Sequence, residues 1–297
     1  MLQKTRALAL AASTTIIVLF LLHNGTTNPF PQHHDLTPAN ATLGFGTILA
    51  VSRPHSRRLP DLLWAANLTD LSIVIPRQPS WNISDLHAFR LDQESSISEG
   101  SARAWLGHLH TLQYFLESGK ETALIIEDDV DWDIGIRHQI SMLASHIQQL
   151  LSLPSSSHST RKEEFWGSTT EWDILYPGHC DDVLPSSENS FPFLEQLHVL
   201  YEDQTVPAHT LLHPDTANFL RALHIPEQTR ILHRTFDPFC TFAYAVNRRS
   251  AEKIVTRFST ESKGASAFDV QLLRACAKGW RCYSVAPELF HHATARA

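Results

Sequence analysis

The sequence predicts an α/β fold in which a mixed, mostly parallel sheet is flanked by helices within one large domain. Short apolar segments rich in β-branched residues alternate along the 297-residue chain with segments whose apolar residues have helical spacing. The apolar segments do not alternate with polar residues, which is typical of strands covered on both faces. Charged residues follow some of them directly, and open α/β sheets bind ligands at the carboxyl ends of their strands.

The chain opens with a predicted strand, helix and strand at residues 44–51, 59–68 and 71–76. A basic turn follows the first strand and includes Arg57 and Arg58. Basic residues at the carboxyl end of a strand could bind phosphate groups, so both arginines are candidate contacts for a nucleotide. A solvated turn is the alternative.

A long helix is predicted at residues 101–118, where the apolar residues recur with helical spacing. Gly119 directly after it fits the glycine that often ends a helix. His108 lies within this helix. It is a candidate contact for the nucleotide, with a purely structural role as the alternative.

The most informative stretch is residues 123–133, where four apolar residues run directly into an acidic segment. Carboxylates packed at a strand end repel one another and resist desolvation, so a fold that keeps them together usually supplies a cation. Oxygen ligands favour Mg²⁺ or Mn²⁺. The alternatives are a solvated acidic loop and, for the last two, acids at the start of a helix. The acidic residues are Glu127, Asp128, Asp129, Asp131 and Asp133.

The rest of the chain continues the alternation of helices and strands. The predicted elements are a helix at 134–153, strands at 172–176 and 241–246, helices at 249–258 and 268–277, and a last strand at 281–286. Residues 181–232 hold many turn residues and no strong pattern, which predicts an irregular segment.

The N-terminal segment predicts a single-pass membrane protein. Residues 1–6 carry Lys4 and Arg6, and residues 7–22 hold no charge. Both a signal peptide and a short signal anchor fit, and the lack of a clear small-x-small cleavage site favours the anchor. Residues 1–6 would then form a cytoplasmic tail, followed by a luminal stem at 23–43 and a catalytic domain at 44–297.

Two further features fit a secretory-pathway protein. Asn-x-Ser/Thr sequons begin at Asn24, Asn40, Asn67 and Asn82. The chain also has four cysteines, which could form two disulfides in an oxidising lumen, and the short spacing of Cys276 and Cys282 favours that pair. Four free buried thiols are the alternative.

Net charge argues against one class of partner. The chain carries a formal charge of −7 with histidine neutral. A general nucleic-acid binder is normally basic, so we expect no nucleic-acid partner.

Six segments in one order resemble glycosyltransferase family 25, which includes lipooligosaccharide and procollagen galactosyltransferases. The last two are similar to the fungal branch in particular. The segments are residues 100–108, 123–130, 172–180, 240–246, 267–270 and 287–292.

The resemblance implies a GT-A fold, a Rossmann-like sheet that binds a nucleotide sugar. It implies transfer of a hexose, with galactose favoured, from a UDP-sugar to a hydroxyl of a glycan or glycoprotein, with Mn²⁺ or Mg²⁺ as the metal. It also implies a type II protein of the Golgi or endoplasmic reticulum membrane. A divalent ion would neutralise the charge that develops on the leaving diphosphate.

The same resemblance assigns roles to individual residues. Asp129 is the first candidate metal ligand and Asp131 the second, while Glu127 and Asp128 would contact ribose or orient the site. Asp269 would be the base that removes the proton of the acceptor hydroxyl, with a helix N-cap as the alternative. The adjacent His291 and His292 could bind the metal or the diphosphate, or belong to a solvated tail.

The sequence departs from the family pattern before the acidic strand. Arg103-Ala104 stands where the family usually has Gly-Cys, and Gly107 where it usually has Ser. These departures support one rival function, a non-catalytic luminal protein that binds glycans or cations. A second rival, a metal-dependent hydrolase, would need a second metal cluster or a nucleophile constellation, and the sequence shows neither.

Overall fold

The computed structural model describes residues 36–90, 97–152, 164–180, 182, 198–235, 237–259 and 266–293. The chain divides into two units, Met1–Leu36 and Thr37–Ala297, and every element described below belongs to the second. None of the helices in these ranges is both long and apolar enough to cross a membrane. The predicted tail and anchor, and the stem up to residue 35, lie outside the described ranges.

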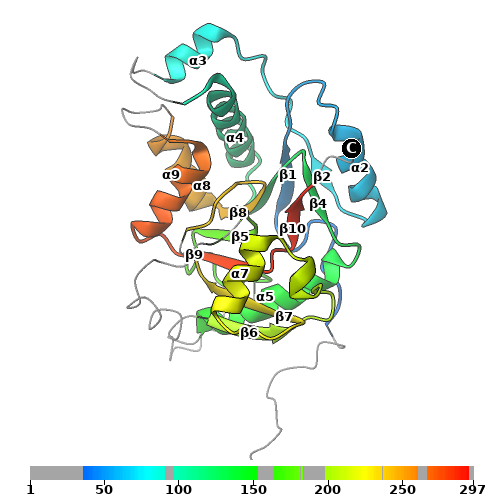
Figure 1. Ribbon diagram of the computed structural model, residues 1–297. Coiled ribbons are helices and arrows are strands. Elements are labelled where there is room, and N and C mark those ends of the chain that lie inside the picture. Colours follow the sequence, from blue (N-terminus) through cyan, green and yellow to red (C-terminus); the bar gives the residue numbers. More distant parts are fainter. Residues whose placement is uncertain are drawn as a thin grey trace, which may run out of the picture. The chain divides into compact units, whose positions relative to one another are not determined.

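Helices and strands are interspersed along the second unit, which confirms the predicted α/β class (Figure 1). The helices are α2 (Leu59–Leu68), α3 (Ile83–Phe89), α4 (Glu99–Glu117), α5 (Ile136–Ser152), α7 (Pro214–Ala222), α8 (Arg248–Arg257) and α9 (Phe268–Ala277), with a 3₁₀ turn η3 (His209–Leu211). The strands are β1 (Thr47–Val51), β2 (Ile73–Val74), β3 (Thr122–Glu127), β4 (Val130–Trp132), β5 (Ile174–Gly178), β6 (His198–Glu202), β7 (Thr229–Arg234), β8 (Ala243–Asn247), β9 (Cys282–Ala286) and β10 (Phe290–His292).

Eight of these strands form one sheet in the order β2-β1-β3-β8-β5-β9-β7-β6. β1 pairs in parallel with β2 and β3, and β5 in parallel with β9. The β3–β8, β5–β8, β7–β9 and β6–β7 pairs are antiparallel. β4 and β10 form a separate antiparallel ribbon.

A mixed sheet is therefore confirmed, but a mostly parallel one is not, because four of the seven strand pairs are antiparallel. The error has a physical cause. Every residue of β8 is buried, so its sequence reads as an unalternating apolar run. Such a run indicates that both faces of the strand are buried, but it does not indicate whether the strand runs parallel or antiparallel to its neighbours.

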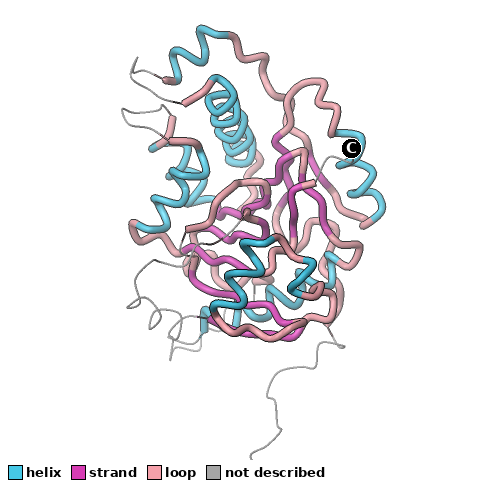
Figure 2. The backbone as a smooth tube through the Cα atoms, in the orientation of Figure 1, coloured by secondary structure: helices cyan, strands magenta, loops and turns pink. Residues whose placement is uncertain are grey.

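Helices cover both faces of the sheet (Figure 2). On one face α4, α8 and α9 pack together, and their apolar side chains form a core with alternate residues of β1, β3, β5 and β8. Trp105 of α4 lies at the centre of this layer, in ring contact with Phe89 and Phe268. Elsewhere α5 contacts β6 and β7, and α7 packs its buried residues on β7 and the end of β9.

Local signals set several helix ends. Ser98 caps α4 by accepting a hydrogen bond from the backbone N–H of Ser101, and Asn82 and Asp85 form a reciprocal capping box on α3. Gly119 follows α4 with φ of +70°, a conformation that suits glycine, as its predicted role at the helix end requires.

The prediction of an irregular segment at 181–232 is wrong from residue 198 onward, where the chain forms β6, η3, α7 and most of β7. These elements were missed because α7 is short and begins at Pro214, and because β6 alternates buried and exposed residues over only five positions. Residues 183–197 lie outside the described ranges. Helix α3 and the β4–β10 ribbon were also not predicted.

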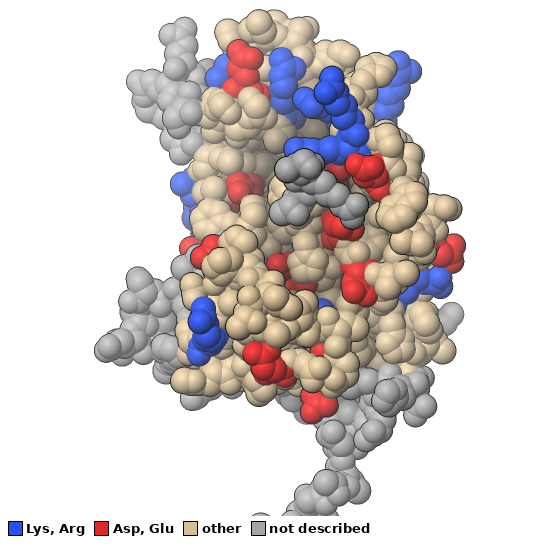
Figure 3. All heavy atoms as spheres, turned by 45° about the vertical axis from the view of Figure 1, so that its right-hand side comes forward, with Lys and Arg blue, Asp and Glu red and all other residues tan. Residues whose placement is uncertain are grey.

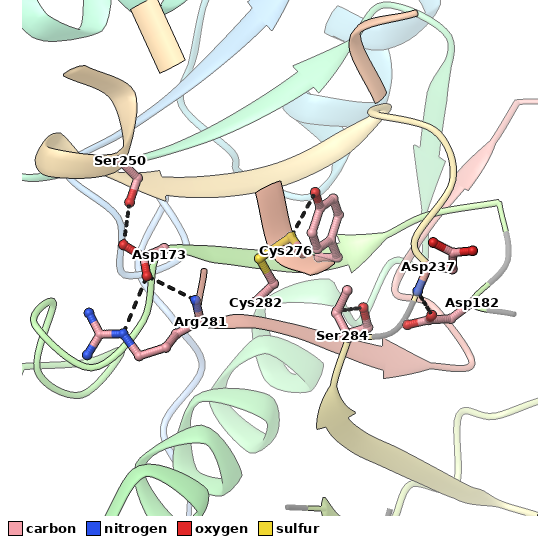
Figure 4. The surroundings of a disulfide bond; sticks show 10 residues. Asp173, Asp182, Asp237, Ser250, Cys276, Arg281, Cys282 and Ser284 are labelled. Atoms are coloured by element: carbon pink, nitrogen blue, oxygen red, sulfur yellow. Dashed lines mark hydrogen bonds and ion pairs between the residues drawn. A yellow bond between two sulfur atoms is a disulfide. The ribbon is translucent and has the colours of Figure 1, made fainter. Parts of the chain in front are cut away.

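Both cysteine pairs form disulfides, Cys180–Cys240 and the favoured Cys276–Cys282. The second joins α9 to β9 beside Tyr176, whose hydroxyl lies 3.9 Å from Cys276 Sγ (Figure 4). Nearby, the buried Asp173 carboxylate accepts hydrogen bonds from the backbone and side chain of Arg281. The prediction of at least one disulfide is confirmed.

Candidate functional site

The candidate site lies at the carboxyl ends of β1 and β3. The two strands are parallel and in register, with Val51 opposite Glu127. The next residue on each strand therefore lies at the same edge, and the Ser52 hydroxyl donates a 2.7 Å hydrogen bond to Asp128 Oδ2. This bond ties the acidic segment to the loop that follows the first strand.

Asp129 is the central carboxylate of the site. Its Oδ2 forms an ion pair with the Arg58 guanidinium and lies 3.6 Å from Nε2 of His292. Its Oδ1 is buried and accepts no hydrogen bond from any described residue. A buried carboxylate oxygen without a partner is costly, so this atom is suited to a ligand that the protein alone does not supply.

The electrostatics of Asp129 agree with that geometry. Burial raises the pKa of its carboxyl above the ordinary value, and the negative charge of Glu127 raises it further. Electrostatic interactions with His292 and Arg58 lower this pKa without cancelling the shift. The site therefore has less positive charge than its carboxylates need, which a bound cation would correct.

Glu127 is held from the opposite side by the core. Its Oε1 accepts a 3.0 Å hydrogen bond from the Thr241 hydroxyl and lies 3.3 Å from Nε2 of His108. His108 in turn contacts the Tyr244 hydroxyl through Nδ1 at 3.2 Å and stacks on Phe268. Burial raises the pKa of Glu127, but hydrogen bonds with His108 and Thr241 and the electrostatic interaction with His108 lower it below the ordinary value overall.

The β4–β10 ribbon brings the C-terminal histidines to the acidic segment. His291 pairs in register with Asp131, and the backbone N–H of Ala293 donates to the Asp129 carbonyl at 2.7 Å. His291 Nδ1 lies 3.2 Å from Glu288 Oε1. Burial raises the pKa of Glu288, but the His291 hydrogen bond and charge bring it below the ordinary value overall.

These elements enclose a cleft of about 1130 Å³ between α2 and the β4–β10 ribbon. On the face turned forward in Figure 3, basic side chains border a group of acidic ones. The cleft can thus hold a ligand of nucleotide-sugar size that carries both anionic and neutral parts. Its lining consists of Arg58, Asp61, Leu62, Trp64, Ala65, Asp128–Asp133 and His291–Ala293.

Not every predicted residue reaches this cleft. His108 is buried on α4, where it contacts Glu127 and Thr241 but does not line the cleft. Arg57 is exposed outside the residues that line the cleft. Asp269 lies in the first turn of α9, where its Oδ1 accepts from the backbone N–H of Val270, and it does not line the cleft. The structure thus does not bring the predicted base to the acidic segment.

The last two acids of the segment are more exposed. Asp131 Oδ1 accepts a hydrogen bond from the backbone N–H of Trp132. Asp133 Oδ1 accepts one from Gly135, one residue before α5 begins at Ile136. Asp133 thus stabilises the turn that leads into the helix, which agrees with the structural alternative considered for it.

A divalent ion at this site would need ligands beyond those that the described residues supply. Among the described residues no three His, Cys, Asp or Glu side chains are placed to hold a metal together. Mg²⁺ and Mn²⁺ at phosphate-transfer sites, however, often take one or two carboxylates and complete their shell with substrate phosphates and water. Asp129 with its unpartnered oxygen, and Asp128 beside it, meet that smaller requirement.

Three residues of the site were missed by sequence reasoning. Ser52 could have been found, because it directly follows a predicted strand at the same sheet edge as Asp128. Thr241 belongs to the segment 240–246 that resembles the family, and it lies at the start of the predicted strand. It comes beside Glu127, at the end of β3, only because β8 runs antiparallel to β3. Glu288 belongs to the segment 287–292 that resembles the family, and its contact with His291 depends on β10.

Comparisons with known proteins leave the family unassigned. No protein-family model and no curated protein matches this sequence. Among solved structures the chain is similar to the crystal structure of A197 from STIV, with a TM-score of 0.33 and 12% identity over 82% of this chain and 81% of that chain. At this TM-score the similarity carries no argument, and the resemblance to glycosyltransferase family 25 stays a prediction.

Proposed function

We propose that this protein is a metal-dependent glycosyltransferase that moves a hexose from a UDP-sugar to a hydroxyl group of a glycan or glycoprotein. Galactose is the favoured hexose. The observation that carries the proposal is Asp129, whose buried and unpartnered oxygen lies in a cleft that also contains the Arg58 guanidinium and the His292 imidazole. A GT-A-like arrangement of β1 and β3 is part of the proposal, supported by their parallel pairing in register.

The chain's own residues suggest how the diphosphate would bind. The side chain of Arg58 is 61% exposed and lies 3.9 Å from Asp128 as well as beside Asp129, so it can turn toward a phosphate without a large desolvation cost. His292 lies on the other side of Asp129 and is also half exposed. A divalent ion held by Asp129, when bound, would neutralise the charge of the leaving diphosphate.

Glu127 would orient the site rather than bind the ion. Its carboxylate is fixed by His108 and Thr241 from the core side, so it presents a constant charge and a defined geometry at the end of β3. Ser52 does the same for Asp128. Carboxylates held by hydrogen bonds from neighbouring side chains give the rigid geometry that transfer chemistry requires.

The second candidate function is a non-catalytic protein that binds a nucleotide sugar, glycan or cation in the same cleft. One observation favours it: Asp269, the expected base, does not line the cleft. The departures from the family pattern give it less support than the sequence suggested. Arg103 and Ala104 are exposed on α4, Gly107 lies against β1, and none of the three lines the cleft.

The test of the proposal is calorimetric binding of UDP with and without Mn²⁺. We expect UDP to bind only weakly without the ion, and Asp129→Asn to lose the Mn²⁺-dependent part of the affinity. Asp133→Asn is the matched control because its carboxylate serves the turn before α5. The proposal fails if UDP does not bind, or if the ion changes its affinity equally in both variants. Release of free hexose from a UDP-hexose then separates the enzyme from the non-catalytic alternative.

A further inference from the structure

Trp64 is an exposed aromatic residue in the wall of the cleft. Its side chain projects from α2, and the residue is 67% exposed although it lines the same cleft as Asp128 and Asp129. No hydrogen bond or ring contact joins Trp64 to any other described residue. Exposing an indole in this way forgoes the free energy of burying a large apolar surface, so a bound ligand is the natural partner for the ring.

The other tryptophan of the cleft is different. Trp132 is buried, and its indole N–H donates a 3.0 Å hydrogen bond to the Thr69 hydroxyl. It also contacts the Phe290 ring at the start of β10. Trp132 therefore fixes the ribbon against α2, and it leaves Trp64 as the aromatic surface of the cleft that is open to a ligand.

The neighbours of Trp64 indicate which ligand would bind. Asp61 is exposed three residues earlier on α2, on the same helical face, and it also lines the cleft. An aromatic face next to a carboxylate complements a pyranose, whose C–H groups pack on the ring while its hydroxyls donate to the carboxylate oxygens. A nucleotide would bring its phosphates toward Asp61, which repels them, whereas a neutral sugar would not.

We propose that Trp64 and Asp61 form a subsite for a neutral sugar ring, and that this ring belongs to the acceptor. The assignment to the acceptor rests on the proposed function, in which the donor diphosphate occupies the end of the cleft with Arg58 and Asp129. The acceptor is then a glycan, and its terminal sugar packs on α2 opposite the β4–β10 ribbon.

The test measures the binding of the methyl glycosides of galactose, glucose and mannose by saturation-transfer NMR titration in the absence of nucleotide. Trp64→Ala should weaken binding of the preferred glycoside about tenfold, the upper range for an aromatic contact. Trp64→Phe should restore most of it. Leu68→Ala is the control, because Leu68 is an exposed apolar residue of the same helix that does not line the cleft. Thermal unfolding of all three variants checks that each is folded.

Each outcome decides between the subsite and its rivals. Equal loss in Trp64→Ala and Leu68→Ala would overturn the subsite, since it would indicate a general effect of the α2 surface. Loss of UDP affinity in Trp64→Ala without loss of sugar affinity would also overturn it, because the ring would then stack on the base. If UDP binds with Mn²⁺ but no glycoside binds, the subsite fails and the proposed function stands. Sugar binding that requires Trp64 without UDP binding supports the subsite and contradicts the proposed transferase.

Discussion

Replacing Asp203 by Asn should destabilise the protein and loosen the strand that carries the cleft histidines. Asp203 and Arg230 form a buried ion pair at 2.6 Å, with side chains only 1% and 4% exposed. The Arg230 guanidinium also donates to the backbone carbonyls of Pro287 and Glu288, just before β10. The pair therefore connects β6 and β7 to the segment that positions His291 and His292.

The expected loss follows from leaving Arg230 charged and buried without its partner. Removing one member of a buried pair costs about 3–5 kcal/mol. For a domain of this size, about 2–4 °C is lost per kcal/mol, so the melting temperature should fall by roughly 6–20 °C. Asp203 also accepts two hydrogen bonds from Thr205, and an Asn oxygen can keep those. The loss should therefore come from the charge.

The same pair gives a pH dependence with a defined sign. Burial raises the pKa of Asp203, but the Arg230 charge and the hydrogen bonds from Arg230 and Thr205 lower it below its ordinary value. A carboxyl with a lowered folded pKa stabilises the protein above its unfolded pKa of about 3.9 and loses that contribution as the pH falls through the folded pKa. The difference in stability between wild type and Asp203→Asn should therefore be constant near neutral pH and shrink below about pH 4.

Urea denaturation followed by circular dichroism at several pH values measures this difference. Glu202→Gln is the matched control, because Glu202 is the exposed neighbour of Asp203, and we expect a change within about 0.5 kcal/mol. A loss below about 1 kcal/mol in Asp203→Asn, or one that does not decrease in acid, would refute the assignment of Asp203–Arg230 as a stabilising buried pair.

Two further predictions concern packing and crosslinks. A Cβ at Gly178 would lie 2.8 Å from the Cβ atoms of Ala243 and Phe290, so Gly178→Ala should cost about 1–3 kcal/mol in urea denaturation, whereas Gly100→Ala in the open first turn of α4 should be neutral or stabilising. The Cys180–Cys240 disulfide spans 60 residues and Cys276–Cys282 spans 6, so replacing each pair by serine should cost about 4 and 2 kcal/mol respectively in the chain-entropy account. Equal losses for the two pairs would contradict that account.

The parts of the fold that are encoded locally could be predicted from the sequence. Helix α2 at Leu59–Leu68 and helix α9 at Phe268–Ala277 were predicted with the residues at which they begin and end, although no side chain caps either helix at its N-terminus. The buried strand that ends at Glu127 was also predicted, since an unbroken apolar run before acids has few other solutions. The rule that strand ends bind ligands singled out Arg58 and Asp129 separately, and the structure shows that they form an ion pair.

The parts that depend on pairing between distant segments could not be predicted. Nothing near His291 in the sequence indicates that it lies opposite Asp131, because that contact follows from antiparallel pairing of two three-residue strands. The direction of β8 is hidden in the same way, and it decides that Thr241 lies beside Glu127. Asp269 was named from a motif match; it lies in the first turn of α9 and does not line the cleft, and its role as the base stays a prediction.

The central proposal is that Asp129 binds a divalent ion, which in turn would neutralise the diphosphate of a UDP-sugar. The measurement that tests it most directly is the rate of UDP-hexose turnover, with water or a glycan as acceptor, across a Mn²⁺ titration for wild type, Asp129→Asn and Asp133→Asn. Asp129→Asn should fold and lose about 10²–10³ in rate, as expected when a charge that stabilises the transition state is removed.

Asp133→Asn should stay close to the wild-type rate, because its carboxylate bonds only the turn before α5 among the described residues. A large loss in Asp129→Asn alone, with saturation by Mn²⁺ shifted to higher concentration, is the result we predict. Equal and small losses in both variants would show that the acidic segment is a solvated loop and would contradict the assignment.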